Sequence, residues 1–236
     1  MTTIPKAGND SFNAVGKRPV RHDGYDKVTG KALYGADMNL PGMLSGRILR
    51  SPHAHARILS IDTSKAEAHP DVQAVLTNAD FPLQENQSTT VIPGPPLNPK
   101  QQTDNILASD KVLYKGHPVA AVAAQSPHVA EEALALIAVE YEVLESVSTV
   151  EEALSGEAPT LHEEYENNIA SHTQLRLGDL EQGFASCSHV VEREFRTATV
   201  HQGYIEPHSA TGWWTPNDRV TIWGSSQGHF QIRDKT

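Results

Sequence analysis

The chain has 236 residues, and its 29 acidic and 19 basic side chains give a net charge of −10 when histidine is neutral. This acidic balance argues against nucleic acid as a partner, because phosphate binding needs a basic surface. Apolar residues make up 38% of the chain and charged residues 20%, a composition that predicts a folded protein with a sizeable core.

Cys187 is the only cysteine in the sequence. One thiol cannot form an internal disulfide, and it cannot hold an iron–sulfur cluster without cysteines from another chain. The sequence contains no apolar run of the ~18 residues that a membrane span needs, and it begins with a polar stretch unlike a secretion signal. We therefore expect a cytoplasmic protein without a membrane span.

The first predicted elements form a strand-helix-strand unit. Runs rich in leucine and isoleucine predict two strands at residues 43–50 and 57–61, joined by a bend. Thr63 then begins a short helix, and residues 72–76 predict the next strand. Five prolines between residues 82 and 99 predict a long loop.

A second strand-helix-strand unit follows this loop. The small apolar residues of 117–124 predict a buried strand, Ser126 and Pro127 predict the start of a helix, and residues 139–144 predict another strand. Leu136 and Ile137 continue the helical spacing. The two units together favour an α+β or α/β domain.

The C-terminal third alternates short elements with polar segments. Residues 150–155 predict a short helix, and Asp179 opens another. The β-branched and charged run at 190–200 predicts an exposed strand. Two apolar runs, 213–214 and 220–223, flank a Thr-Pro-Asn-Asp turn and predict a hairpin.

One motif after this hairpin suggests nucleophilic catalysis. Residues 224–228 fit the pattern G-x-S-x-G, which makes Ser226 a formal candidate nucleophile. A hydrolase of this type needs an acid and then a histidine downstream, whereas His229 and Asp234 follow in the opposite order. A serine hydrolase is therefore a distant alternative.

Histidine pairs and clusters are the other candidate sites. His53 and His55 would share a face of a strand and could approach a metal, but no third ligand lies nearby, so structural roles are favoured. Residues 201–208 place histidine, glutamine, tyrosine and glutamate side by side. This cluster could orient a buried polar cofactor or form a solvated turn, and residue types alone leave both readings open.

Several separate segments of the chain, taken in their order, resemble the molybdenum-binding subunit of the xanthine dehydrogenase and aldehyde oxidase family, which includes molybdenum-type carbon monoxide dehydrogenase. Their order along the chain carries the resemblance more than any single motif does. The similar segments are residues 15–17, 27–34, 41–44, 50–56, 72–77, 116–120 and 139–142. One local departure is His117, which stands where the family more often has glutamine.

The resemblance implies an α+β chain in which an α/β hammerhead domain precedes the start of a molybdopterin-binding domain. The implied divisions are a lead-in at 1–19, the hammerhead domain at 20–145, a linker at 146–177 and the beginning of the molybdopterin-binding domain at 178–236.

The resemblance also implies a set of cofactor-binding residues. In the family a strand ends in Thr-Gln or Ser-Gln, and the glutamine amide lies beside the molybdenum oxo group. Gln227 and its neighbour Gly228 match this position, which makes the glutamine the functional residue in place of Ser226. Gln202 and Glu206 match supporting residues that precede the hairpin.

The implied reaction is oxidative hydroxylation of an aldehyde, an N-heterocycle or a related small molecule, with water as the oxygen source. The implied cofactor is molybdenum with molybdopterin in its cytosine dinucleotide form. A [2Fe-2S] chain, an FAD chain and the rest of the molybdenum domain would be partners. No catalytic residue and no direct metal ligand is expected in this chain, because the family's glycine-rich segment and general-base glutamate would lie beyond Thr236 or in a partner. The alternative is a non-catalytic hammerhead scaffold subunit that docks redox partners.

Overall fold

The computed structural model describes residues 15–82, 99–163 and 165–235. It divides into two compact units, of which the first joins the chain up to Leu40 with the chain from Glu194 onward, and the second is Pro41–Arg193. Helices and antiparallel sheets occur together, which confirms the α+β fold class. Most of the predicted lead-in, and the proline-rich loop except for its two ends, lie outside the described residues. The division of the chain into residues 1–19, 20–145, 146–177 and 178–236 stays a prediction.

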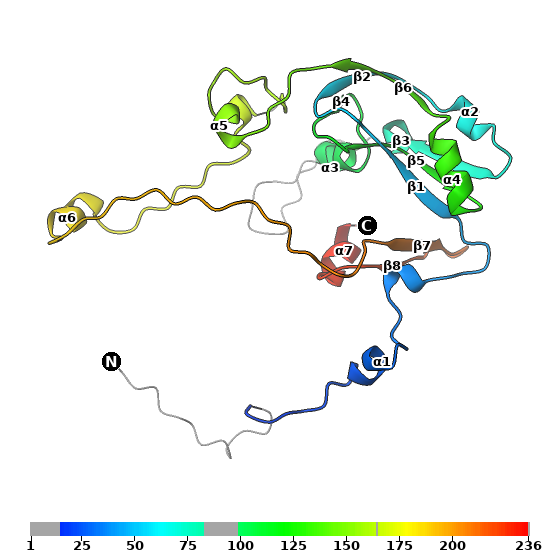
Figure 1. The fold of residues 1–236 in the computed structure, drawn as a ribbon, viewed down its shortest axis with the longest axis horizontal. Helices are drawn as coiled ribbons and strands as arrows, with labels where there is room; N and C mark the ends of the chain where they lie inside the picture. The colour runs from blue at the N-terminus through cyan, green and yellow to red at the C-terminus, as the bar shows by residue number, and fades with distance from the viewer. Residues whose placement is uncertain (1–14, 83–98, 164, 236) are drawn as a thin grey trace. The chain divides into compact units, whose positions relative to one another are not determined.

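The second unit contains two three-stranded antiparallel sheets (Figure 1). One has the order β1-β5-β3, formed by β1 (Ser45–Arg50), β5 (Pro118–Ala124) and β3 (Val72–Thr77). The other has the order β4-β2-β6, formed by β4 (Lys111–Val112), β2 (Ala56–Asp62) and β6 (Ala138–Val143). The predicted bend after β1 is therefore the point where the chain changes sheets.

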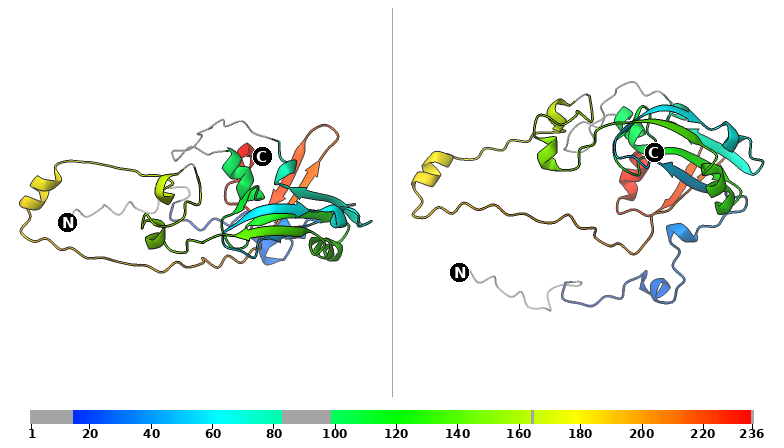
Figure 2. Two further views of the ribbon diagram at one scale, coloured as in Figure 1. Left: turned by 90° about the horizontal axis from the view of Figure 1, so that it is seen from above. Right: turned by 45° about the horizontal axis from the view of Figure 1, so that its top comes forward.

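Each predicted strand-helix-strand unit crosses from one sheet to the other. Helix α2 (Ser64–Glu67) connects β2 to β3, and α4 (Pro127–Leu134) connects β5 to β6. Strand β6 pairs with β2, and the two lie side by side in Figure 2. The Ser126 hydroxyl accepts a hydrogen bond from the Val129 N–H at 3.2 Å, so α4 begins as the sequence predicts. Its end was predicted too late, because Leu136 and Ile137 bond to carbonyls three residues back in a tighter turn.

Small side chains form the core between α4 and the first sheet. Ala120, Val122 and Ala124 of β5 are almost completely buried, and they share a cluster with Ala130 and Ala133 of α4. Alanine allows the helix to approach the sheet closely, so this core depends on close packing rather than on large side chains. A second cluster joins the start of β5 to β2 and β4.

The remaining elements are short. In the first unit these are α1 (Gly24–Val28), η1 (Gly35–Asp37), β7 (Ala210–Trp214), β8 (Val220–Gly224) and α7 (His229–Lys235); in the second they are η2 (Asn78–Asp80), α3 (Pro99–Ile106), α5 (Val150–Ala153), η3 (Glu166–Asn168) and α6 (Leu180–Ala185). The hairpin, α5 and α6 were predicted, whereas α1, α3 and α7 were not. No helix in the described part of the chain combines the length and the apolar character needed to cross a membrane.

The predicted strand at residues 190–200 is wrong. The structure leaves this segment without secondary structure, and every residue in it is exposed. Strand propensity needs a neighbouring strand to take effect, and none of the described residues pairs with this segment.

His117 is the largest of the fully buried side chains among the described residues, and both of its ring nitrogens are bonded. The Leu113 N–H donates to Nδ1 at 3.2 Å, so Nε2 carries the proton that is donated to the Asp104 carbonyl at 2.8 Å. The ring also stacks on Tyr114 at 4.4 Å between centroids. Burial lowers the pKa of His117, which favours the neutral ring that this bonding pattern requires.

We expect the His117→Gln variant to lose less stability on acidification than the wild type. Histidine in the unfolded chain binds a proton near pH 6.5, above the lowered pKa of the folded state, so stability falls as pH drops from about 6.5 toward that lower value. The free energy of unfolding by urea, measured at about pH 7.5 and about pH 5.5, tests this. Equal losses in both proteins would contradict the prediction.

The buried strand β5 gives a second expectation. Val122→Ala should lower the free energy of unfolding by about 2 kcal/mol, because it removes two buried methyl groups and leaves a cavity. The matched control is Val143→Ala on β6, where the side chain is 64% exposed, and a change below about 0.5 kcal/mol is expected. Similar values for the two variants would show that β5 is not central to the core.

Candidate functional site

The predicted cofactor-binding residues lie in the first unit, on the two segments that flank the hairpin of β7 and β8. The hairpin turn contains Asp218 in the left-handed region at φ 57°, and its carboxylate accepts a hydrogen bond from the Trp214 indole at 3.2 Å. Thr215 N–H donates to the Arg219 carbonyl at 2.9 Å across the same turn. The hairpin therefore separates the segment that carries Gln202 and Glu206 from the segment that carries Gln227 and Gly228.

Ser225 ties these two segments together. Its hydroxyl donates to the Glu206 carboxylate at 2.9 Å and lies 3.2 Å from the Pro207 carbonyl oxygen. Its N–H donates to the Ser209 carbonyl at 3.3 Å. Sequence reasoning missed Ser225; the only available signal was a hydroxyl side chain directly after a strand. Glu206 is thus brought to the end of β8.

The backbone on both sides of Gln227 is anchored. Ser225 is bonded as described, and on the other side the Gly228 N–H donates to the Ser226 hydroxyl at 2.9 Å. The Gly228 carbonyl accepts from the Ile232 N–H at 3.0 Å, which starts α7. The Gln227 side chain is exposed and forms no hydrogen bond with any residue that the structure describes. A fixed backbone therefore presents an amide with both N–H donors available.

Gln202 lies in a segment without regular secondary structure, whose neighbouring residues make aromatic contacts. The Gly203 N–H donates to Nδ1 of His201 at 3.0 Å, and Gly203 has φ 65°, a conformation that favours glycine. The Tyr204 ring lies between His201 and His208, at 5.0 Å and 4.7 Å between ring centroids. Within the described residues the amide of Gln202 is exposed and without a hydrogen-bonding partner. No hydrogen bond joins Gln202 to Gln227 among the described residues.

A close approach of η1 completes this part of the first unit. A Cβ atom at Gly35 would lie 2.6 Å from the Ser209 hydroxyl oxygen, so only glycine fits without a shift. The Ser209 hydroxyl is buried and has no hydrogen-bonding partner among the described residues. The N-terminal segment thus packs directly on the start of β7.

The geometry does not support Ser226 as a nucleophile. Its hydroxyl accepts from the Gly228 N–H, and His229 contacts the Phe230 ring at 4.3 Å between centroids. Within the described residues no histidine is hydrogen-bonded to Ser226, so the base that a nucleophilic serine needs is missing there.

His53 and His55 have separate structural roles. The His53 ring packs edge-on against Tyr141 at 5.1 Å between centroids. His55 is 4% exposed, and its Nδ1–H donates to the Glu145 carbonyl. The described part of the chain contains no group of three or more histidine, cysteine, aspartate or glutamate side chains placed to hold a metal ion.

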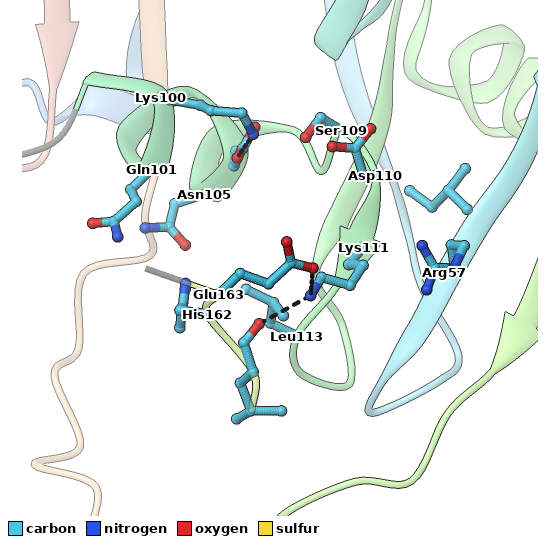
Figure 3. A pocket seen from close by; sticks show the side chains of 13 residues that line it. Arg57, Lys100, Gln101, Asn105, Ser109, Asp110, Lys111, Leu113, His162 and Glu163 are labelled. Atoms are coloured by element: carbon cyan, nitrogen blue, oxygen red, sulfur yellow. Dashed lines mark hydrogen bonds and ion pairs between the residues drawn. The ribbon is translucent and has the colours of Figure 1, made fainter. Parts of the chain in front are cut away.

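The second unit contains a cavity of about 590 Å³ (Figure 3). The Lys111 ammonium donates to the Leu161 carbonyl at 3.3 Å and pairs with Glu163 at 3.2 Å, both within the cavity wall. These contacts fasten part of the predicted linker to β4. None of the predicted cofactor-binding residues lines this cavity.

Comparison with known proteins gives two family matches. Residues 29–145 match the family described as "Aldehyde oxidase and xanthine dehydrogenase, a/b hammerhead domain". Residues 161–236 match the family described as "Molybdopterin cofactor-binding domain". The two matches follow each other in the order that the resemblance implied.

Individual relatives are longer than this chain. It is 37% identical to a probable xanthine dehydrogenase component of Bacillus subtilis, over 91% of this chain and 27% of the relative. It is 35% identical to the nicotinate dehydrogenase large molybdopterin subunit of Eubacterium barkeri, over 92% of this chain and 48% of the relative. A solved structure of reconstituted CO dehydrogenase from Oligotropha carboxidovorans is similar with a TM-score of 0.76 at 33% identity, covering 93% of this chain and 28% of that one.

The bond between Ser225 and Glu206 can be tested by amide hydrogen exchange. Ser225→Ala removes this hydroxyl, and we expect several-fold faster exchange of the amides in residues 204–209 because their link to the end of β8 is lost. Ser226→Ala is the matched control, since its hydroxyl bonds only within its own turn. Equal exchange of residues 204–209 in both variants would show that the bond does not order the segment.

Proposed function

Because the chain belongs to the aldehyde oxidase and xanthine dehydrogenase family, we propose that it is part of the molybdenum-cofactor subunit of a molybdenum hydroxylase. The proposed substrates are an aldehyde, an N-heterocycle or a related small molecule, oxidised with water as the oxygen source. The chain spans between 27% and 48% of the length of the two curated relatives named above, so the complete activity requires the remainder of such a subunit.

The observation that carries the proposal is the anchored backbone around Gln227. The Ser225 hydrogen bonds hold the backbone before Gln227, and the bond from the Ile232 N–H to the Gly228 carbonyl holds it after, while the amide side chain stays exposed. An amide held in this way can donate a hydrogen bond to a cofactor at little cost in conformational entropy. Its neighbour Gly228 has no side chain, so the backbone next to Gln227 would allow a cofactor to approach closely.

Gln202 and Glu206 would support this residue in different ways. Gln202 offers a second exposed amide, two residues before Tyr204, whose ring packs against two histidines. Glu206 uses one carboxylate oxygen to hold Ser225, so its main effect is to position the segment that carries Gln227. Direct contact of either residue with the cofactor is part of the proposal.

Exposed amide donors suit a cofactor rich in oxygen and phosphate, and the molybdopterin-binding match covers all of these residues. When bound, molybdenum would accept two electrons from the substrate and lower the pKa of coordinated water. This chain would orient the cofactor through hydrogen bonds, and a general-base glutamate from elsewhere in the subunit would move the proton. We take the cofactor to be the cytosine dinucleotide form.

Electrons must leave the site through other chains. A single, exposed cysteine cannot ligate a [2Fe-2S] cluster, so iron–sulfur and FAD chains are proposed as partners, together with the remaining part of the molybdenum domain. Cys187 donates only to the Gly183 carbonyl, at 3.3 Å. A free exposed thiol supports assembly in a reducing compartment, which we take to be the cytoplasm.

Gln227→Ala tests this assignment in the purified molybdenum-containing complex. We expect turnover to fall about 10- to 100-fold at unchanged molybdenum content, because the variant loses an orienting hydrogen bond and little packing. Steady-state rates, normalised to the molybdenum measured in each preparation, give the comparison. Wild-type turnover at full molybdenum loading would refute the role of Gln227.

The matched control is Ser226→Ala, one residue earlier. Its hydroxyl bonds only to the Gly228 N–H, so we expect turnover within a factor of about ten of the wild type. Complete loss of activity with the cofactor still bound would support nucleophilic catalysis instead. A wild-type complex that contained neither molybdenum nor pterin would favour the scaffold alternative.

A further inference from the structure

A short loop in the second unit is closed by a single side chain. The Asn168 amide oxygen accepts a hydrogen bond from the Leu161 N–H at 2.9 Å, and its amide nitrogen donates to the Pro159 carbonyl at 3.1 Å. Asn167 and Asn168 both lie in the left-handed region, at φ 53° and 58°, as consecutive residues of a tight turn do. We call the described residues of 159–168 the clasp.

Two elements of the second unit hold the clasp. The Lys111 ammonium on β4 donates to the Leu161 carbonyl and pairs with Glu163 (Figure 3). The side chain of Lys111 is 19% exposed and that of Glu163 is 83% exposed, so the ion pair is partly screened by water. On α3, the Gln101 amide donates to the Tyr165 hydroxyl at 3.2 Å. The clasp is therefore attached at two points that are distant from it in sequence.

The elements that receive the clasp are joined to each other by His117. Its ring donates to the Asp104 carbonyl of α3 and accepts from the N–H of Leu113, the residue that follows β4. These bonds are buried, and Val112 of β4 is also fully buried. Helix α3 and strand β4 thus form a fixed base for the two attachment points, Gln101 and Lys111.

Exposure changes where the clasp ends. Four clasp residues are half-buried: Leu161, His162, Tyr165 and Asn168. Each residue from 169 to 208 is exposed. The match to the molybdopterin cofactor-binding family begins at residue 161, yet the clasp residues after that point are bonded to β4 and α3. Contacts and sequence match therefore assign this short stretch to different domains.

We infer that the clasp is part of the hammerhead domain and fastens to it the chain that leads to the predicted cofactor-binding residues. The hammerhead domain then extends to residue 168, beyond the predicted boundary at 145, and residues 169–177 are the exposed part of the predicted linker. A shorter free linker raises the effective concentration of the parts that it joins. The clasp lies wholly within Pro41–Arg193, so its formation does not depend on which cofactor the chain binds.

Amide hydrogen exchange of the full chain in its purified complex tests the attachment. Lys111→Met keeps the apolar stem and removes the ammonium, so we expect several-fold faster exchange of the clasp amides and unchanged exchange in β5. The matched control is Lys115→Met, an exposed lysine later in the same segment, for which we expect wild-type exchange. Equal exchange of the clasp amides in the two lysine variants would overturn the inference.

A second pair of variants tests the closure of the clasp without touching β4. Glycine adopts the left-handed region readily, so Asn168→Gly and Asn167→Gly both keep the turn, but only the first removes the bonds to Leu161 and Pro159. We expect faster exchange of the clasp amides in Asn168→Gly alone, and equal exchange in the two variants would overturn the inference. This pair also decides the outcome if Lys111→Met accelerates exchange in β5.

Discussion

The hydrogen bond between Ser225 and Glu206 is the interaction on which the candidate site depends. The two residues are 19 positions apart, and the hairpin of β7 and β8 lies between them. Together with the bonds from Ser225 to the Pro207 and Ser209 carbonyls, it joins the segment that carries Gln202 to the segment that carries Gln227. With it, the carboxylate, the end of β8 and the turn before α7 form one connected structure. The site is therefore a property of the hairpin and its two flanks.

The second unit is held together by apolar packing and by a buried histidine. Its helix α4 packs on β5 through alanines, and its largest fully buried side chain, His117, is held by backbone groups of Asp104 and Leu113. These contacts are internal to Pro41–Arg193 and include none of the predicted cofactor-binding residues. The residues that line the cavity of this unit likewise include none of them.

Local signals in the sequence predicted much of this fold. The pair Ser126 and Pro127 predicted the start of α4 because a hydroxyl cap and a fixed φ act within one turn. The run at β5 predicted a buried strand because each of its side chains is small and apolar. Sheet membership could not be predicted in the same way, since the partners of β1 and β2 lie more than 50 residues away along the chain. The failed strand at 190–200 has the same cause, because pairing is a long-range property.

The candidate site was predicted less completely. Pattern and family resemblance singled out Gln227 and Glu206, but neither identifies Ser225 as the residue that joins them, because a hydrogen bond across a hairpin leaves no fixed spacing in sequence. The G-x-S-x-G pattern singled out Ser226, whose hydroxyl instead closes a turn with the Gly228 N–H. Short motifs specify side-chain types, whereas the role of each hydroxyl depends on which partner the fold brings near.

The most direct test of the central claim is the distance from the Gln227 amide nitrogen to the nearest cofactor atom, measured in an experimental structure of the assembled, molybdenum-containing complex. Our account predicts a hydrogen-bond distance of about 3 Å, with Ser225 still bonded to Glu206. An amide directed away from the cofactor, at more than about 5 Å, would contradict it, because no hydrogen bond extends over that distance.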